Sequence, residues 1–302
     1  MTDDIHLHKP ADFDRYWLDV DQELARFEAR PELRYSGRRS TDFAKSYDLR
    51  LTSLGPYRIF GFFSVPDGPG PFPALLYTPR YGSVNNPPHY DDRRRYVVVT
   101  VVHRGQRLAD EPFQASYPGL LTLDIDRAGS YIYRGIVADC LRAAEWLLSR
   151  PEVDARRVGV IGDDLALITA ARRPAIAALQ ISSLMFYRVM DARKRTSEYP
   201  IEEINDFLRI YPAQKESVAE TLRYFDPIDH AGNVRARTLI AVGDPGKLGG
   251  PEWVQPLTAA LGSQAEHYMA THEGGTDRDE IDAWMSRELS VPAAPRLWEA
   301  AR

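Results

Sequence analysis

The sequence predicts an α/β fold in which helices cover a mostly parallel β-sheet. Short apolar strands alternate with segments of helical periodicity along most of the 302 residues, which favours right-handed crossovers between parallel strands. Residues 96–103 are mostly valine, the continuous apolar pattern of a strand that is covered on both faces. Residues 158–162 form a second apolar strand, which runs through a glycine and two aspartates into an alanine-rich helix.

Periodicity and turn residues place the individual elements. Two β-rich segments that meet at Gly55-Pro56 predict a hairpin, and a polar, aromatic, helical stretch late in the chain is typical of a cap over the sheet. The expected elements in chain order are helix 10–30, strands 46–54, 57–65, 74–78 and 96–103, loop 104–129, helix 131–148, strands 158–162 and 176–182, the helical stretch 190–225, strand 238–242, helix 252–261, strand 266–270 and helix 277–289. We expect one domain over residues 1–302, with an N-terminal helical extension at about 10–30 and a cap-like excursion at about 190–225.

Composition excludes several classes of function. The net charge is −5 and no Lys/Arg stripe is visible, which argues against a nucleic-acid-binding protein. No apolar run reaches membrane-spanning length and the N-terminus does not resemble a signal peptide, so we expect a cytoplasmic protein that does not bind membranes. Cys140 is the single cysteine, and no cluster has metal-ligand spacing or the pattern of a phosphate loop. We therefore predict no metal and no cofactor, and a small molecule as the substrate.

The most informative stretch is Gly162-Asp163-Asp164-Leu165-Ala166. A strand, a sharp turn and a helix with small residues on both sides of the central residue are the layout of a nucleophile elbow. The central residue of that motif carries the nucleophile, and here it is Asp164. The chemistry of the protein therefore depends on what a carboxylate does at this turn.

Motifs along most of the chain resemble those of one known family. They are Asp12-Phe13-Asp14-Arg15-Tyr16-Trp17, Arg104-Gly105-Gln106, Tyr131-Ile132-Tyr133-Arg134, Pro151-Glu152-Val153-Asp154, the elbow itself and Thr271-His272-Glu273. In this order and spacing they resemble the acetyl xylan esterase and cephalosporin C deacetylase family, carbohydrate esterase family seven. The resemblance implies an α/β-hydrolase fold and a tendency to form homo-oligomers.

The catalytic positions of that family are changed in this chain. The family's elbow reads Gly-Gly-Ser-Gln-Gly, so its serine corresponds to Asp164 and its oxyanion residue corresponds to Leu165. The family's His-Gly-Tyr corresponds to Pro79-Arg80-Tyr81, which keeps only the tyrosine. Its triad acid falls on Gly246 by spacing, and the nearest carboxylate is Asp244, two places earlier. His272 alone keeps both position and identity, so hydrolysis by a serine nucleophile is not expected.

Three hypotheses follow for Asp164. In the first it is a nucleophile that forms a covalent ester, which His272 hydrolyses with help from an acid such as Asp244. In the second, Asp164 and His272 form an acid/base pair without a covalent step, for hydrolysis, elimination or isomerisation. In the third, the protein binds a ligand and is catalytically inactive. Asp163 is a difficulty for the first hypothesis, because a second carboxylate beside Asp164 raises the pKa of one of the two. Arg80, if it points inward, is suited to hold a substrate carboxylate through a two-pronged hydrogen bond.

Overall fold

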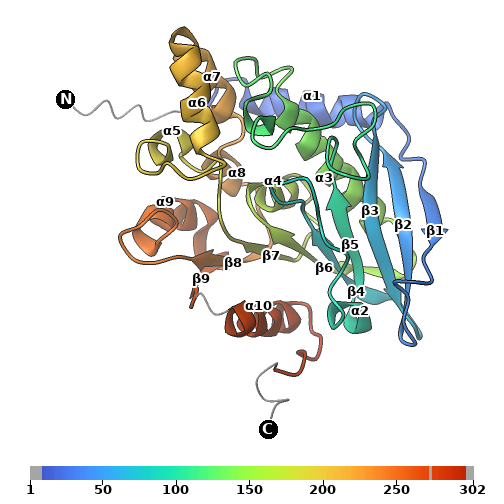
Figure 1. Ribbon diagram of the computed structural model, residues 1–302. Coiled ribbons are helices and arrows are strands. Elements are labelled where there is room, and N and C mark those ends of the chain that lie inside the picture. Colours follow the sequence, from blue (N-terminus) through green and yellow to red (C-terminus); the bar gives the residue numbers. More distant parts are fainter. Residues whose placement is uncertain (1–8, 272–273, 297–302) are drawn as a thin grey trace.

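The computed structural model describes residues 9–271 and 274–296, and its centre is one mixed β-sheet (Figure 1). Over these residues the nine strands follow the order β1-β2-β3-β5-β4-β6-β7-β8-β9. The pairs from β1 to β5 are antiparallel, and those from β5 through β4 to β9 are parallel. The strands are β1 (Glu32–Tyr35), β2 (Ala44–Thr52), β3 (Arg58–Pro66), β4 (Phe72–Tyr77), β5 (Val97–Val102), β6 (Val153–Gly162), β7 (Ala178–Ile181), β8 (Arg237–Val242) and β9 (Ala265–Met269).

Helices cover both faces of the sheet, with α3 and α4 on one face and α10 on the other (Figure 1). Alternate residues of β5 show the two layers, because Val97 and Val99 pack beside α3 whereas Val98 packs with Trp284 of α10. No helix in the described ranges is long and apolar enough to cross a bilayer. The helices are α1 (Phe13–Ala25), α2 (Asp92–Arg95), α3 (Ile132–Leu148), α4 (Asp164–Arg172), α5 (Val189–Ala192), α6 (Glu202–Ile210), α7 (Lys215–Arg223), α8 (Pro227–Ala231), α9 (Pro251–Leu261) and α10 (Gly274–Glu288).

The expected strands and main helices are present, with boundaries that shift by a few residues. The 46–54 and 57–65 hairpin is the β2–β3 pair, and the 190–225 stretch folds into α5, α6 and α7. Strand β1 was not predicted, because all four of its residues are exposed and it has no alternation of apolar and polar side chains. Residues 93–95 lie in the short helix α2, and the Arg95 guanidinium donates to Asp282 of α10 at 3.2 Å.

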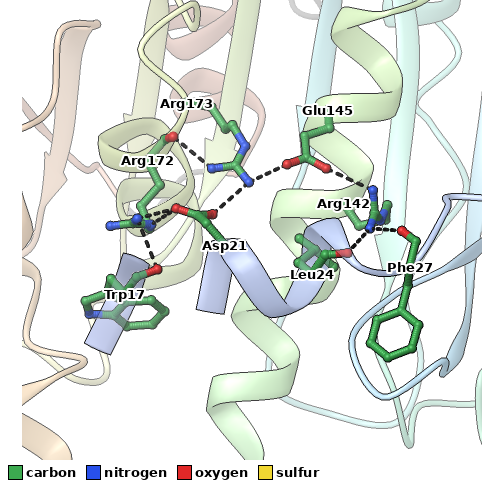
Figure 2. Close-up of polar contacts among 8 residues, drawn as sticks. All are labelled: Trp17, Asp21, Leu24, Phe27, Arg142, Glu145, Arg172 and Arg173. Atoms are coloured by element: carbon green, nitrogen blue, oxygen red, sulfur yellow. Dashed lines mark hydrogen bonds and ion pairs between the residues drawn. The ribbon is translucent and has the colours of Figure 1, made fainter. Parts of the chain in front are cut away.

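The N-terminal helix α1 is fixed to the body of the protein by a network of charges (Figure 2). The carboxylate of Asp21 accepts hydrogen bonds from Arg172 and Arg173 at the C-terminal end of α4. Arg173 also donates to Glu145 of α3 at 2.6 Å, and Glu145 accepts from Arg142 at 3.1 Å. The network therefore holds α4, which begins at the two aspartates, against both α1 and α3.

Candidate active site

Two adjoining cavities lie at the carboxyl ends of β4, β6 and β7, where parallel α/β sheets bind ligands. The larger cavity has a volume of about 430 Å³, and the smaller one about 10 Å³. A volume of about 10–15 Å³ on this measure holds one water molecule. Both cavities are lined by Arg80, Tyr81, Asp163 and Met185. The smaller one is completed by Pro79, His103, Tyr133, Asp164, Leu165 and Phe186.

The turn between β6 and α4 brings Asp163 to both cavities. Gly162 ends β6, and a Cβ atom there would lie 1.9 Å from the Thr78 hydroxyl of the neighbouring strand segment, so only glycine fits. Asp163 is the N-cap of α4, and its Oδ1 accepts the Leu165 N–H at 3.0 Å. The side chain that faces the larger cavity is therefore Asp163, one residue before the one that the sequence singles out.

Asp164 is the first residue of α4 and is buried, with 1% of its surface exposed. Its Oδ2 accepts the Met185 N–H at 2.5 Å, and its Oδ1 accepts the Phe186 N–H at 3.0 Å. Both oxygens thus bind backbone amides in the segment that follows β7. Non-glycine residues with positive φ occur elsewhere in the described ranges, but Asp163 and Asp164 are not among them. The backbone at this turn is therefore not in a left-handed, strained conformation.

Burial dominates the protonation of the two carboxyl groups. It raises the pKa of Asp163 to about 6, while the Leu165 N–H and the charge of Arg80 act in the opposite direction. Burial, followed by repulsion from Asp163, raises the pKa of Asp164 well above its usual value, and the amides of Met185 and Phe186 oppose this rise. Asp163, with a pKa of about 6, is therefore mostly ionised at pH 7, whereas burial and the charge of its neighbour favour the protonated form of Asp164.

The loop after β4 carries Arg80 and Tyr81 into the cavities and is fixed by Gln106. The Gln106 amide donates to the carbonyl oxygens of Arg80 at 3.0 Å and Gly82 at 2.7 Å. The Tyr81 hydroxyl donates to the buried carboxylate of Glu203 in α6, which also accepts the Gly119 N–H at 2.8 Å. Gln106 and Glu203 thus brace the loop from two sides.

His103 lines the smaller cavity and was not among the predicted site residues. It follows β5 directly, is 2% exposed, and its Nδ1 donates to the Arg104 carbonyl at 2.5 Å. Burial lowers the pKa of His103 to about 4, so the ring is neutral at pH 7 and its Nε2 carries no proton. The signal in the sequence that this prediction missed is a histidine at the carboxyl end of a valine-rich strand.

The remaining predicted site residues have different surroundings. The Leu165 N–H donates to Asp163, so it does not point to a substrate oxygen in this structure. Asp244 lies in the loop after β8, where it pairs with Lys247 at 2.8 Å, and it is not among the described residues that line the two cavities. His272 lies outside the described residues. Among the residues that the structure does describe, no group of His, Cys, Asp or Glu is arranged to hold a metal ion.

Comparison with known proteins decides the family. The family model described as acetyl xylan esterase (AXE1) matches residues 5–256. The chain belongs to the acetyl xylan esterase family. Over 95% of its length this family member superimposes on 96% of an acetyl xylan esterase from a Paenibacillus species, with 25% identity and a TM-score of 0.80.

Two further relatives share the family's fold or sequence at low identity. Acetyl xylan esterase 1 from a Thermoanaerobacterium species shares the fold at a TM-score of 0.76 and 24% identity, over 93% of this chain and 94% of that one. An acetyl esterase from Xylanibacter ruminicola is 23% identical over 255 residues, which cover 78% of this chain. The chain spans 56% of the length of that curated relative. The architecture is thus the α/β-hydrolase fold, with a mostly parallel nine-stranded sheet in the described ranges and an N-terminal helix.

Proposed function

We propose that this member of the family hydrolyses small esters by general-base catalysis, with Asp163 as the base. The observation that carries the proposal is the water-sized cavity beside the larger one, lined by Arg80, His103 and both aspartates. A buried water needs two to four polar partners, and this lining offers them. Asp163 borders both cavities, so it can contact a water in the smaller cavity and a substrate in the larger one.

The protonation states support this assignment. With a pKa raised to about 6 by burial, Asp163 is ionised at pH 7 yet basic enough to accept a proton from water. Asp164 does not line the larger cavity, and both of its oxygens already accept backbone N–H groups, so Asp163 is the carboxylate placed to take that proton. A base with a pKa near the working pH contributes about 10²–10⁴-fold to the rate.

The reaction balances with these groups and one water. Asp163 takes a proton from the water as its oxygen adds to the ester carbonyl carbon. The bond from that carbon to the alcohol oxygen then breaks, and the leaving alkoxide takes the proton back from Asp163. The products are a carboxylic acid and an alcohol, and no covalent enzyme intermediate forms. The ester substrate is inferred from the names of the relatives, which are esterases.

The surroundings of Asp164 favour this route over covalent catalysis by that residue. A nucleophilic carboxylate needs one oxygen directed at the substrate. Both Asp164 oxygens instead accept backbone N–H groups, and Asp164 does not line the larger cavity. The role of His272 as a partner of the aspartates remains a prediction from the sequence.

The test is hydrolysis of 4-nitrophenyl acetate by the wild type, Asp163→Asn, Asp164→Asn and His272→Ala. We expect Asp163→Asn to lower kcat by at least about a hundredfold at pH 7.5 while the fold is kept. Turnover in water labelled with oxygen-18 should leave both aspartates unlabelled. Label in the Asp164 carboxylate would instead establish the covalent route, and an Asp163→Asn variant with the wild-type rate would exclude Asp163 as the base.

A second candidate function is ligand binding without turnover. Both Asp164 oxygens accept backbone N–H groups, and the Leu165 N–H donates to Asp163, so none of these groups is directed at a substrate. This arrangement favours a protein that binds a ligand without converting it. On this reading the wild type hydrolyses none of a panel of aryl esters, whereas esters or their products raise its melting temperature. Measurable turnover that depends on Asp163 excludes this candidate.

A further inference from the structure

One wall of the larger cavity includes a buried hydrogen-bond donor without a partner among the described residues. Gln180 lies on β7, is 3% exposed and lines the cavity beside Ile161 of β6. Its Nε2 is fully buried and makes no hydrogen bond in the part of the chain that the structure describes. Buried amide groups are nearly always paired, so this donor indicates a group that arrives with a ligand.

A cation lines the same cavity. The Arg80 side chain is exposed to it, and within residues 9–271 and 274–296 its guanidinium forms no ion pair. Ser182 and Ser183 also line the cavity, so most of its polar residues can donate hydrogen bonds. Asp163 is the acidic residue among the lining residues.

The rest of the lining is apolar. It is contributed by the segment after β7, by the cap-like region, by the loop after β8 and by α9, through Leu184, Met185, Ile201, Leu248 and Trp253. A ligand that matches the whole cavity therefore has an acceptor-rich, anionic end and a short apolar body. The volume of about 430 Å³ is within the range that holds a small organic molecule.

We propose that Arg80 and Gln180 bind a carboxylate of the substrate, so that the preferred substrates are half-esters of short dicarboxylic acids. This inference rests on the proposed function, because it places the ester group of the same molecule beside Asp163. The planar guanidinium of Arg80 matches a carboxylate, and the Gln180 amide adds a donor that is already desolvated. The charge of Arg80 also offsets repulsion between the substrate carboxylate and Asp163.

The first experiment compares kcat/KM for the mono-4-nitrophenyl ester of glutaric acid with kcat/KM for 4-nitrophenyl butyrate. We expect kcat/KM of the wild type to be at least about tenfold higher for the acidic ester. The neutral ester cannot form the charge-assisted hydrogen bonds of the carboxylate, and the loss of one such bond has an effect of this size. Arg80→Met, Gln180→Leu and Gln180→Glu should each reduce that ratio about tenfold or more. Arg156→Met, whose side chain is 92% exposed, is the control and should keep the wild-type ratio. An unchanged ratio in the folded Arg80→Met variant overturns the proposal.

The second experiment separates this proposal from the proposed function. Glutarate is titrated calorimetrically into the wild type, Asp163→Asn and Arg80→Met. Binding to the first two and loss of at least tenfold affinity in Arg80→Met supports the carboxylate site, even if no ester is hydrolysed. Turnover of neutral esters that depends on Asp163, without glutarate binding, keeps the proposed function and overturns the carboxylate site.

Discussion

Replacing Asp163 by asparagine should make the protein more stable at neutral pH than the wild type. The variant keeps the helix cap, because asparagine also accepts the Leu165 N–H, but it removes the charge. The wild-type pKa rises from 3.8 to about 6 on folding. At about 1.36 kcal/mol per pKa unit, this difference corresponds to about 3 kcal/mol.

The sign of the pH dependence follows from the direction of the shift. A folded-state pKa above the unfolded value means that the folded protein binds the proton more tightly, so this contribution is complete below pH 3.8 and is lost as the pH rises through 6. The wild type should therefore lose up to about 3 kcal/mol relative to Asp163→Asn between pH 4 and 7.5. Removal of the Asp163 charge also relieves Asp164, which acts in the same direction.

The assay is urea denaturation of both proteins at pH 4.5, 6.0 and 7.5. The free-energy gap between the variant and the wild type should widen with pH. Asp14→Asn, at a side chain that is 79% exposed, is the matched control, and its gap should stay small throughout. A gap that is constant across the three pH values, or that narrows as the pH rises, would refute the reasoning about a buried carboxylate.

Three further predictions concern the framework around the site. Asp21→Ala removes the shared partner of Arg172 and Arg173, at the C-terminal end of α4, and should lower the free energy of unfolding by about 1–3 kcal/mol. The exposed Asp14→Ala should change it little. Gly135→Ala should destabilise the protein by about 1–3 kcal/mol despite the better helix propensity of alanine, because its Cβ would lie 2.5 Å from the Arg104 guanidinium. Gly275→Ala has open space around it and should not destabilise the protein. Denaturant unfolding of both variants tests this difference. Glu203→Ala leaves the Tyr81 hydroxyl and two backbone amides without their acceptor, so it should lower the free energy of unfolding by at least about 2 kcal/mol and speed proteolysis in α6. Equal cleavage rates for the variant and the wild type would contradict this prediction.

Most of the fold can be predicted from the sequence, because valine-rich strands and alternating helices have strong periodic patterns. Strand β1 cannot be predicted in this way, because all of its residues are exposed and it pairs along the sheet with β2. The strand–turn–helix layout around the two aspartates was likewise predictable. Which of them faces the cavity was not, because that depends on how the first turn of α4 is capped.

Other parts of the site depend on contacts between distant segments. Gln180 lies in a short buried strand, and only the packing of its neighbours shows that its amide has no partner. Glu203 reaches Tyr81 across 122 residues of sequence, and a single sequence holds no sign of that contact. His103, by contrast, stood at the end of a predicted strand, a position where α/β proteins place functional side chains.

The most direct test of Asp163 as the base is the pH dependence of kcat/KM for 4-nitrophenyl acetate in the wild type and Asp163→Asn. The wild-type rate should rise with a single ionisation near pH 6, the value to which burial raises the pKa of Asp163. In the variant, kcat/KM should no longer rise with pH near 6 and should be at least about a hundredfold lower than in the wild type at pH 7.5. A variant with the wild-type kcat/KM and the wild-type rise near pH 6 would contradict the role of Asp163 as the base.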